Sequence, residues 1–128
     1  MALQPAAPLA RPDALLVVCL CAQWCHVCED YRSRFAQVQQ NVLADYPQTQ
    51  FLWIDVEDQA DLLEPLDIDD FPTILLATGA VPRFFGPISP QLPTLERLVR
   101  HSAADWSGVA LADPALHALV ARLLIYKK

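Results

Sequence analysis

The chain has 128 residues, 54% of them hydrophobic, and a formal net charge of −6. This length and apolar content fit one domain that can bury a core without disulfides or metal, and they exclude a disordered protein. The acidic balance argues against a nucleic-acid partner, because binding to phosphates needs a basic surface. The longest apolar run, residues 14–22, is too short to cross a membrane.

The N-terminal segment, residues 1–13, is rich in proline and alanine. It has neither the basic n-region nor the clean apolar h-region of a signal peptide, so we expect an extended lead-in to the domain. The cytoplasm is therefore the expected compartment, where cysteines usually serve as thiols, ligands or redox centres.

The first predicted elements are a strand, a helix, a strand and a short helix. Residues 15–21 form a continuous apolar run, which predicts a buried parallel strand. Residues 26–44 predict a helix, because apolar residues recur at spacings of three and four and make one stripe. The stripe consists of Val27, Tyr31, Phe35, Val38 and Val42. Residues 51–56 predict a second buried strand, and residues 59–64 predict a short acidic helix that Pro65 stops.

The second half of the chain predicts a hairpin and two helices. Residues 73–78 predict a strand, and Gly79-Ala80 a tight turn into a strand over residues 81–85. Residues 90–101 predict a helix, and Asp113-Pro114 opens a final one. The fold class is thus α/β, a mixed sheet with helices on both faces. We expect one domain over residues 14–104 and a C-terminal helical extension, residues 105–128, that packs on the domain or on a partner.

The strongest chemical signal is the pair Cys25 and Cys28, which falls where the first strand gives way to the first long helix. Two cysteines three apart in a first helical turn point the same way and can close a disulfide. Unpaired N–H groups and the helix dipole favour a thiolate at the first position. Cys25 is therefore the predicted nucleophile, and Cys28 is the resolving thiol that attacks the mixed disulfide.

Three segments carry a family resemblance. Residues 22–28, AQWCHVC, resemble the Ala-x-Trp-Cys-x-x-Cys active-site motif of the thioredoxin family. Residues 71–73, FPT, resemble that family's cis-proline loop, and residues 84–86, FFG, resemble its glycine segment beside the substrate groove. The resemblance, which runs from about residue 15 to residue 101, implies a thioredoxin-like mixed sheet flanked by helices, with the additional C-terminal helix appended.

The resemblance also implies an activity, thiol–disulfide exchange on protein substrates through Cys25 and Cys28. It requires no cofactor, and the reducing equivalents would come from a reductase or from glutathione. The residues expected to flank the site or bind substrate are Trp24, His26, Val27, Phe71 and Pro72. The alternative is a redox-inactive or weakly active interaction module, chaperone-like, that binds one specific protein.

Several positions depart from the family pattern. His-Val stands between the cysteines in place of Gly-Pro, and a protonated His26 would stabilise the thiolate and make the couple more oxidising. Cys19 stands where the family usually buries an aspartate, and Trp53 stands about where that aspartate's lysine partner would be. Both members of a buried polar pair are thus replaced together, which avoids an uncompensated charge.

Cys19 and Cys21 are two residues apart on the first strand, so we expect their side chains to share one face and to point toward Cys28. They are either small core residues or auxiliary thiols that take part in oxidation. A four-cysteine metal site is the weaker option, because a stiff strand and a helix start do not readily form a tetrahedron.

Acidic residues crowd the stretch from residue 55 to residue 70, and no lysine or arginine occurs between Arg34 and Arg83. Such a stretch is either a solvated face or a surface that attracts a basic partner.

Overall fold

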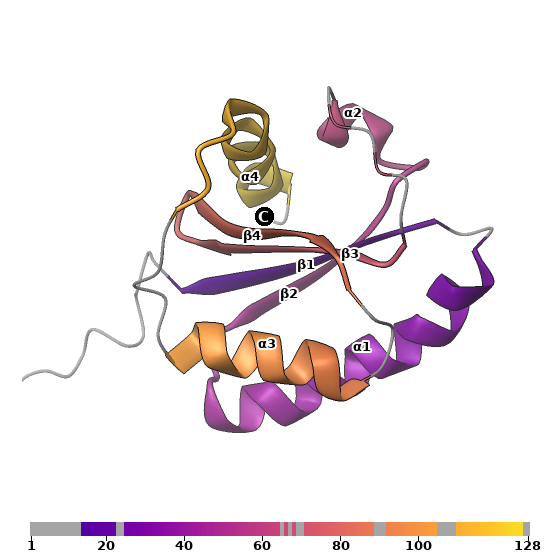
Figure 1. Ribbon diagram of the computed structural model, residues 1–128, viewed down its shortest axis with the longest axis vertical. Helices are drawn as coiled ribbons and strands as arrows, with labels where there is room; N and C mark the ends of the chain where they lie inside the picture. Colours follow the sequence, from indigo (N-terminus) through magenta and orange to yellow (C-terminus); the bar gives the residue numbers. More distant parts are fainter. Residues whose placement is uncertain are drawn as a thin grey trace, which may run out of the picture.

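The computed structural model describes residues 14–22, 25–64, 66, 68, 71–88, 92–104 and 110–126. Its centre is a four-stranded sheet in the order β2-β1-β3-β4 (Figure 1). The strands are β1 (Leu15–Cys21), β2 (Gln50–Asp55), β3 (Thr73–Thr78) and β4 (Val81–Pro87). β1 runs parallel to β2 and antiparallel to β3, and β3 and β4 form an antiparallel hairpin, so the predicted mixed sheet is confirmed.

Helices cover both faces of the sheet (Figure 1). α1 (His26–Asp45) and α3 (Leu92–Ala104) lie on one face, and α2 (Ala60–Leu63) and α4 (Pro114–Tyr126) lie on the other. The prediction of helices on both faces is therefore confirmed. The observed bounds differ from the predicted ones by a few residues at the ends of most elements, and the expected lead-in over residues 1–13 lies outside the described residues.

The alternation of side chains along β1 divides the interior into two cores. Leu15, Val17, Cys19 and Cys21 face α1 and α3, and they pack with the buried stripe of α1. The intervening residues, Leu16, Val18 and Leu20, face α4 and α2. All seven residues of β1 are buried, as expected for a central strand covered on both sides.

The C-terminal helix α4 packs on the domain itself. Leu119, Val120 and Leu123 are buried against the second face of the sheet. Arg122 adds a polar tie, because its guanidinium donates to the carbonyl oxygens of Leu62 (2.8 Å) and Glu64 (2.6 Å) at the end of α2. No helix in the described part of the chain has the length and hydropathy that a bilayer crossing demands.

On the opposite face a second arginine joins α1 to α3. Arg100 of α3 bonds Asp45 at 2.7 Å and Glu96 at 2.9 Å, and it donates to the carbonyl oxygen of Asn41 at 2.9 Å. The side-chain amide of Asn41 also donates to Glu96 at 2.9 Å. This network fixes the two helices side by side beneath the first core.

Candidate active site

The thiol of Cys25 lies at the start of the longest helix. Cys25 is the N-cap of α1, with extended backbone angles (φ −90°, ψ 119°), and its carbonyl oxygen accepts the first helical hydrogen bond from the N–H of Glu29 at 3.1 Å. Its own N–H donates to the carbonyl of Ala22 at 3.1 Å, which turns the chain out of β1 and into the helix. Cys25 is half-buried and is a free thiol. Negative charge is stabilised at such a helix start.

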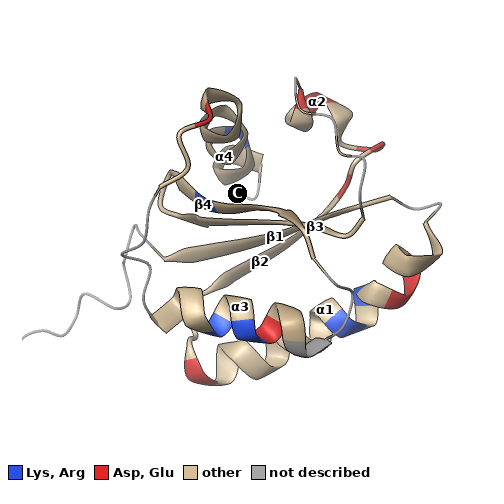
Figure 2. Ribbon diagram, viewed as in Figure 1, with Lys and Arg blue, Asp and Glu red and all other residues tan. Residues whose placement is uncertain are grey.

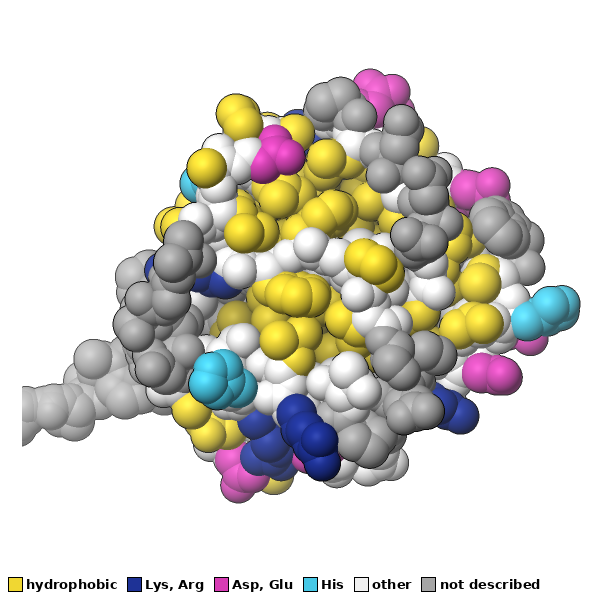
Figure 3. Space-filling model, in the orientation of Figure 1, with side chains coloured by type: hydrophobic (Ala, Val, Ile, Leu, Met, Phe, Trp, Pro, Cys, Tyr) yellow, Lys and Arg dark blue, Asp and Glu magenta, His cyan; other side chains and the backbone are white. Residues whose placement is uncertain are grey.

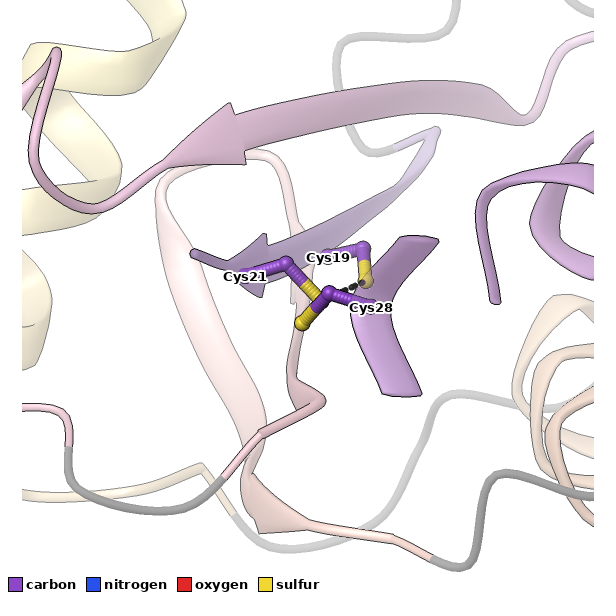
Figure 4. The surroundings of a disulfide bond; sticks show 3 residues. All are labelled: Cys19, Cys21 and Cys28. Atoms are coloured by element: carbon purple, nitrogen blue, oxygen red, sulfur yellow. Dashed lines mark hydrogen bonds between the residues drawn. A yellow bond between two sulfur atoms is a disulfide. The ribbon is translucent and has the colours of Figure 1, made fainter. Parts of the chain in front are cut away.

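Cys28 is not bonded to Cys25. It lies one turn into α1, fully buried, and forms a disulfide with Cys21 at the end of β1, with 5.7 Å between the two Cα atoms (Figure 4). The spacing of the motif predicts a Cys25–Cys28 bond, and the structure differs because the buried face of α1 turns Cys28 toward the strand beneath it. Cys25, at the cap, keeps a free sulfur at the edge of the same core.

Cys19 completes a group of three buried sulfur-bearing side chains (Figure 4). Its Sγ lies 3.9 Å from the Sγ of Cys21, within the range of a sulfur hydrogen bond. Both residues share the face of β1 that packs against Cys28, so the predicted common face is confirmed. Burial raises the pKa of the Cys19 thiol far above its ordinary value, which keeps the proton on its sulfur.

Two residues of α1 that were not among the predicted site residues border the sulfur cluster. Tyr31 is fully buried one turn after Cys28, and its hydroxyl is the one buried side-chain oxygen or nitrogen among the described residues that has no hydrogen-bond partner. Burial raises the pKa of Tyr31, and the nearby Cys19 raises it further. The helical spacings of three and four from Cys28 were the available signal for Tyr31 and for Arg32.

Arg32 lies over the indole of Trp53, 5.0 Å from the ring centroid. Trp53 is the register partner of Cys19 on β2, so the two residues predicted to replace the family's buried polar pair are neighbours. The ring of Phe35 meets the indole edge-on, with 5.7 Å between centroids. At the position where the resemblance implies a buried lysine, the chain therefore has Trp53, and the guanidinium of Arg32 lies over the indole.

An open pocket of about 290 Å³ lies beside the disulfide. Its walls are Ala22, Cys28, Glu29, Arg32, Trp53 and Asp55. The lining combines apolar side chains with one cationic group, Arg32, and two acidic groups, Glu29 and Asp55.

The predicted cis-proline loop is present. The peptide bond between Phe71 and Pro72 is cis. Pro72 is buried and its carbonyl oxygen accepts from the N–H of Ile88 at 3.3 Å, while Phe71 packs against the same core as Cys25. Of the other expected flanking residues, His26 and Val27 are exposed on the first turn of α1, and Trp24 lies outside the described residues.

The described part of the acidic stretch surrounds α2 and the turn before it (Figure 2). One oxygen of Asp55 accepts from the N–H groups of Glu57 (2.9 Å) and Asp58 (3.0 Å), so this carboxylate organises the turn. Asp67, Asp69 and Asp70 lie outside the described residues. No group of three ligating side chains suited to a metal ion occurs within the described ranges.

Comparisons with known proteins agree with this architecture. The family model described as Thioredoxin matches residues 6–86, well over half of the chain. None of the curated proteins compared with the chain matches it.

Solved structures extend the likeness at the level of the fold. Human ERp44 in a zinc-bound form is 17% identical with a TM-score of 0.65; the match covers 80% of this chain and 32% of that one, so this chain spans about a third of ERp44. The thioredoxin Deadhead of Drosophila melanogaster is 19% identical with a TM-score of 0.60, over 70% of this chain and 81% of that one. Oxidised thioredoxin of Plasmodium falciparum is 18% identical with a TM-score of 0.58, over 79% and 93%. The chain belongs to the thioredoxin family.

Proposed function

We propose that the chain is a thiol–disulfide oxidoreductase that acts on protein disulfides, with Cys25 as the attacking thiol and Cys28 as the resolving thiol. The observation that carries the proposal is the position of Cys25, a half-buried free thiol on the N-cap of α1, beside a second sulfur that already forms a disulfide. The fold and the cis-proline loop support it.

The reaction consists of two exchanges. The Cys25 thiolate attacks a disulfide of the client protein, a mixed disulfide forms, and one client sulfur leaves as a thiolate. The Cys28 thiolate then attacks the Cys25 sulfur, and the second client sulfur leaves as a thiolate. The client disulfide is thereby reduced, and a disulfide between Cys25 and Cys28 forms in its place. An external reductant, either a reductase or glutathione, returns it to the thiol form.

A turbidity assay of insulin reduction tests the proposal. We expect the wild type to reduce insulin with dithiothreitol or glutathione as electron source, and the Cys25→Ser variant to lose that activity. The matched control is Cys19→Ser, which removes a buried free thiol on β1 and should keep most of the activity. Equal activity of wild type and Cys25→Ser would contradict the assignment. Cys28→Ser should accumulate mixed disulfides that identify the client.

One observation favours a second candidate, a client-binding module without turnover. The Cys21–Cys28 disulfide deprives Cys25 of its expected resolving thiol. A protein held in that form would bind a client through Cys25 and the pocket beside the disulfide without reducing it. Absence of insulin reduction in both wild type and Cys25→Ser would favour this candidate.

The surroundings of the site add two lesser proposals. We propose the cytoplasm as the compartment, because a reducing environment keeps thiols such as Cys19 and Cys25 free. We also propose that the acidic surface around α2 attracts a basic segment of the partner. Salt screens attraction between exposed charges, and it does so more strongly at about 0.5 M than at about 0.05 M. Weaker binding of the partner at the higher salt concentration would support an electrostatic role for the acidic surface.

A further inference from the structure

We propose that Cys21 is a third redox-active cysteine, which takes Cys28 away from Cys25 by intramolecular exchange and returns Cys25 to the surface as a free thiol. This inference rests on the proposed function, since it concerns the fate of the bond between Cys25 and Cys28 once that bond has formed. It is carried by the disulfide between Cys21 and Cys28, together with the free thiol of Cys25 beside the same core.

The exchange needs no further oxidant or reductant. The Cys21 thiolate attacks the Sγ of Cys28, the Cys21–Cys28 bond forms and the Cys25–Cys28 bond breaks. Cys25 leaves as a thiolate, so the number of disulfides and thiols is unchanged, and the proton lost from Cys21 is returned to solvent.

The direction of the exchange depends on which sulfur atom carries the negative charge after it. Cys21 is almost completely buried at the end of β1, where a thiolate is poorly solvated. Cys25 lies at the start of a 20-residue helix and is partly open to solvent. The exchange therefore moves charge from the core to a helix N-terminus, which stabilises it. The opposite placement would leave an ionised sulfur in the core.

Cys19 is placed to assist at the buried end. Its sulfur lies 3.9 Å from that of Cys21 and keeps its proton, so its S–H group donates toward Cys21 when that sulfur carries charge. This is the role of a positioning residue, and serine, whose hydroxyl also donates, should replace it.

The consequence for function is an oxidised protein that still presents a reactive thiol. With Cys28 bonded to Cys21, a mixed disulfide between Cys25 and a client has no resolving thiol beside it and persists. The redox state of the buried pair then decides whether the protein releases its client or retains it.

Counting released thionitrobenzoate tests the exchange on the full, folded chain. With excess dithiobis(nitrobenzoate), the fully reduced wild type should release about three equivalents and end with a stable adduct on Cys25. One is released when Cys25 reacts, one when Cys28 displaces the label, and one when Cys21 frees Cys25 to react again. Cys21→Ser should release about two and carry no adduct, and Cys19→Ser, whose hydroxyl keeps a donor beside Cys21, should still release about three. Two equivalents from the wild type, or three from Cys21→Ser, would overturn the proposal.

Disulfide mapping keeps the proposal testable if a variant does not fold. Chymotrypsin cleaves after Trp24 and separates Cys21 from Cys28, whereas no lysine or arginine separates the four cysteines. Mildly oxidised wild type, alkylated with N-ethylmaleimide, should give two cross-linked peptides with the label on Cys25. An internal Cys25–Cys28 loop with the label on Cys21 would refute the exchange while leaving the proposed oxidoreductase intact. Full insulin reduction by Cys25→Ser would instead refute the oxidoreductase, and with it the exchange.

Discussion

Replacing Tyr31 by phenylalanine tests the description of the sulfur cluster. The Tyr31 side chain is fully buried, and its hydroxyl has no hydrogen-bond partner within the described structure. An unmade hydrogen bond at a buried polar group costs about 1–3 kcal/mol, whereas phenylalanine fills nearly the same volume without that cost. We therefore expect Tyr31→Phe to stabilise the disulfide form by about 1 kcal/mol, after allowing for the small space that the oxygen leaves.

Thermal and urea unfolding of the oxidised protein would measure the change. For a chain of this size, 1 kcal/mol corresponds to an increase of about 3–5 °C in Tm. The matched control is Tyr126→Phe at the end of α4, where the tyrosine is 44% exposed and its hydroxyl is free to bond water. We expect that control to stay within about 0.5 kcal/mol of the wild type.

The sign of the change tests whether the Tyr31 hydroxyl is unbonded, as the structure describes it. A loss of 1 kcal/mol or more in the oxidised form would mean that the hydroxyl is already bonded, and the reasoning would fail.

Other expectations concern the helices and the acid–base behaviour. Leu119→Ala should lower the free energy of unfolding by about 2–5 kcal/mol, because Leu119 is buried where α4 packs on the sheet. The control is Ile125→Ala on the same helix, at a residue 76% exposed, which should change the free energy of unfolding by less than about 0.5 kcal/mol. Equal effects of the two variants in urea unfolding would contradict the packing of α4 on the core. Hydrogen bonds from Asn41 and Arg100 lower the pKa of Glu96, so its contribution to stability is present above the ordinary value of 4.5 and is lost as the pH falls through the lowered value. Melting curves from pH 6 to about pH 3 should therefore fall less steeply for Glu96→Gln. Burial raises the pKa of Cys19, so the reduced protein should lose stability as the pH rises above the ordinary thiol value of 9.0, and Cys19→Ser should lose less.

Much of the fold could be predicted because burial leaves a periodic trace in the sequence. The unbroken apolar run of β1 signals a strand covered on both faces, and the stripe from Tyr31 to Val42 signals one buried helix face. The prediction included Val27 in that stripe, and this was wrong. Val27 is 42% exposed, because the buried stripe of α1 begins at Cys28, three residues before Tyr31, and Val27 lies outside it.

The partner of Cys28 could not be predicted, for a geometrical reason. Spacing along a helix shows that Cys25 and Cys28 are close, but it cannot show how far Cys28 lies from a strand that precedes it. That distance depends on how α1 packs against β1, which is a property of the whole core. The sequence did predict that Cys19 and Cys21 share the face of β1 that points toward Cys28. Only the packing of α1 on β1 shows that Cys21 lies close enough to Cys28 to form the disulfide.

The apolar surface over the sheet between α3 and α4 (Figure 3) bears on the choice between turnover and capture. β4 is an edge strand, and its Phe84 and Phe85 are only partly buried, one beside each core. A client that adds its backbone to such an edge would be held by contacts that do not depend on the state of Cys25.

Binding and chemistry can therefore be separated in this molecule. If the chain retains a client as proposed, Cys25→Ser should abolish the covalent retention and leave contacts with the edge strand in place. Substituting Phe84 by alanine should weaken client binding in the presence and absence of reductant alike, and Cys25→Ser should weaken it only where a mixed disulfide would have formed. If both variants lose binding only under non-reducing conditions, the edge strand contributes nothing and the sulfur chemistry alone holds the client.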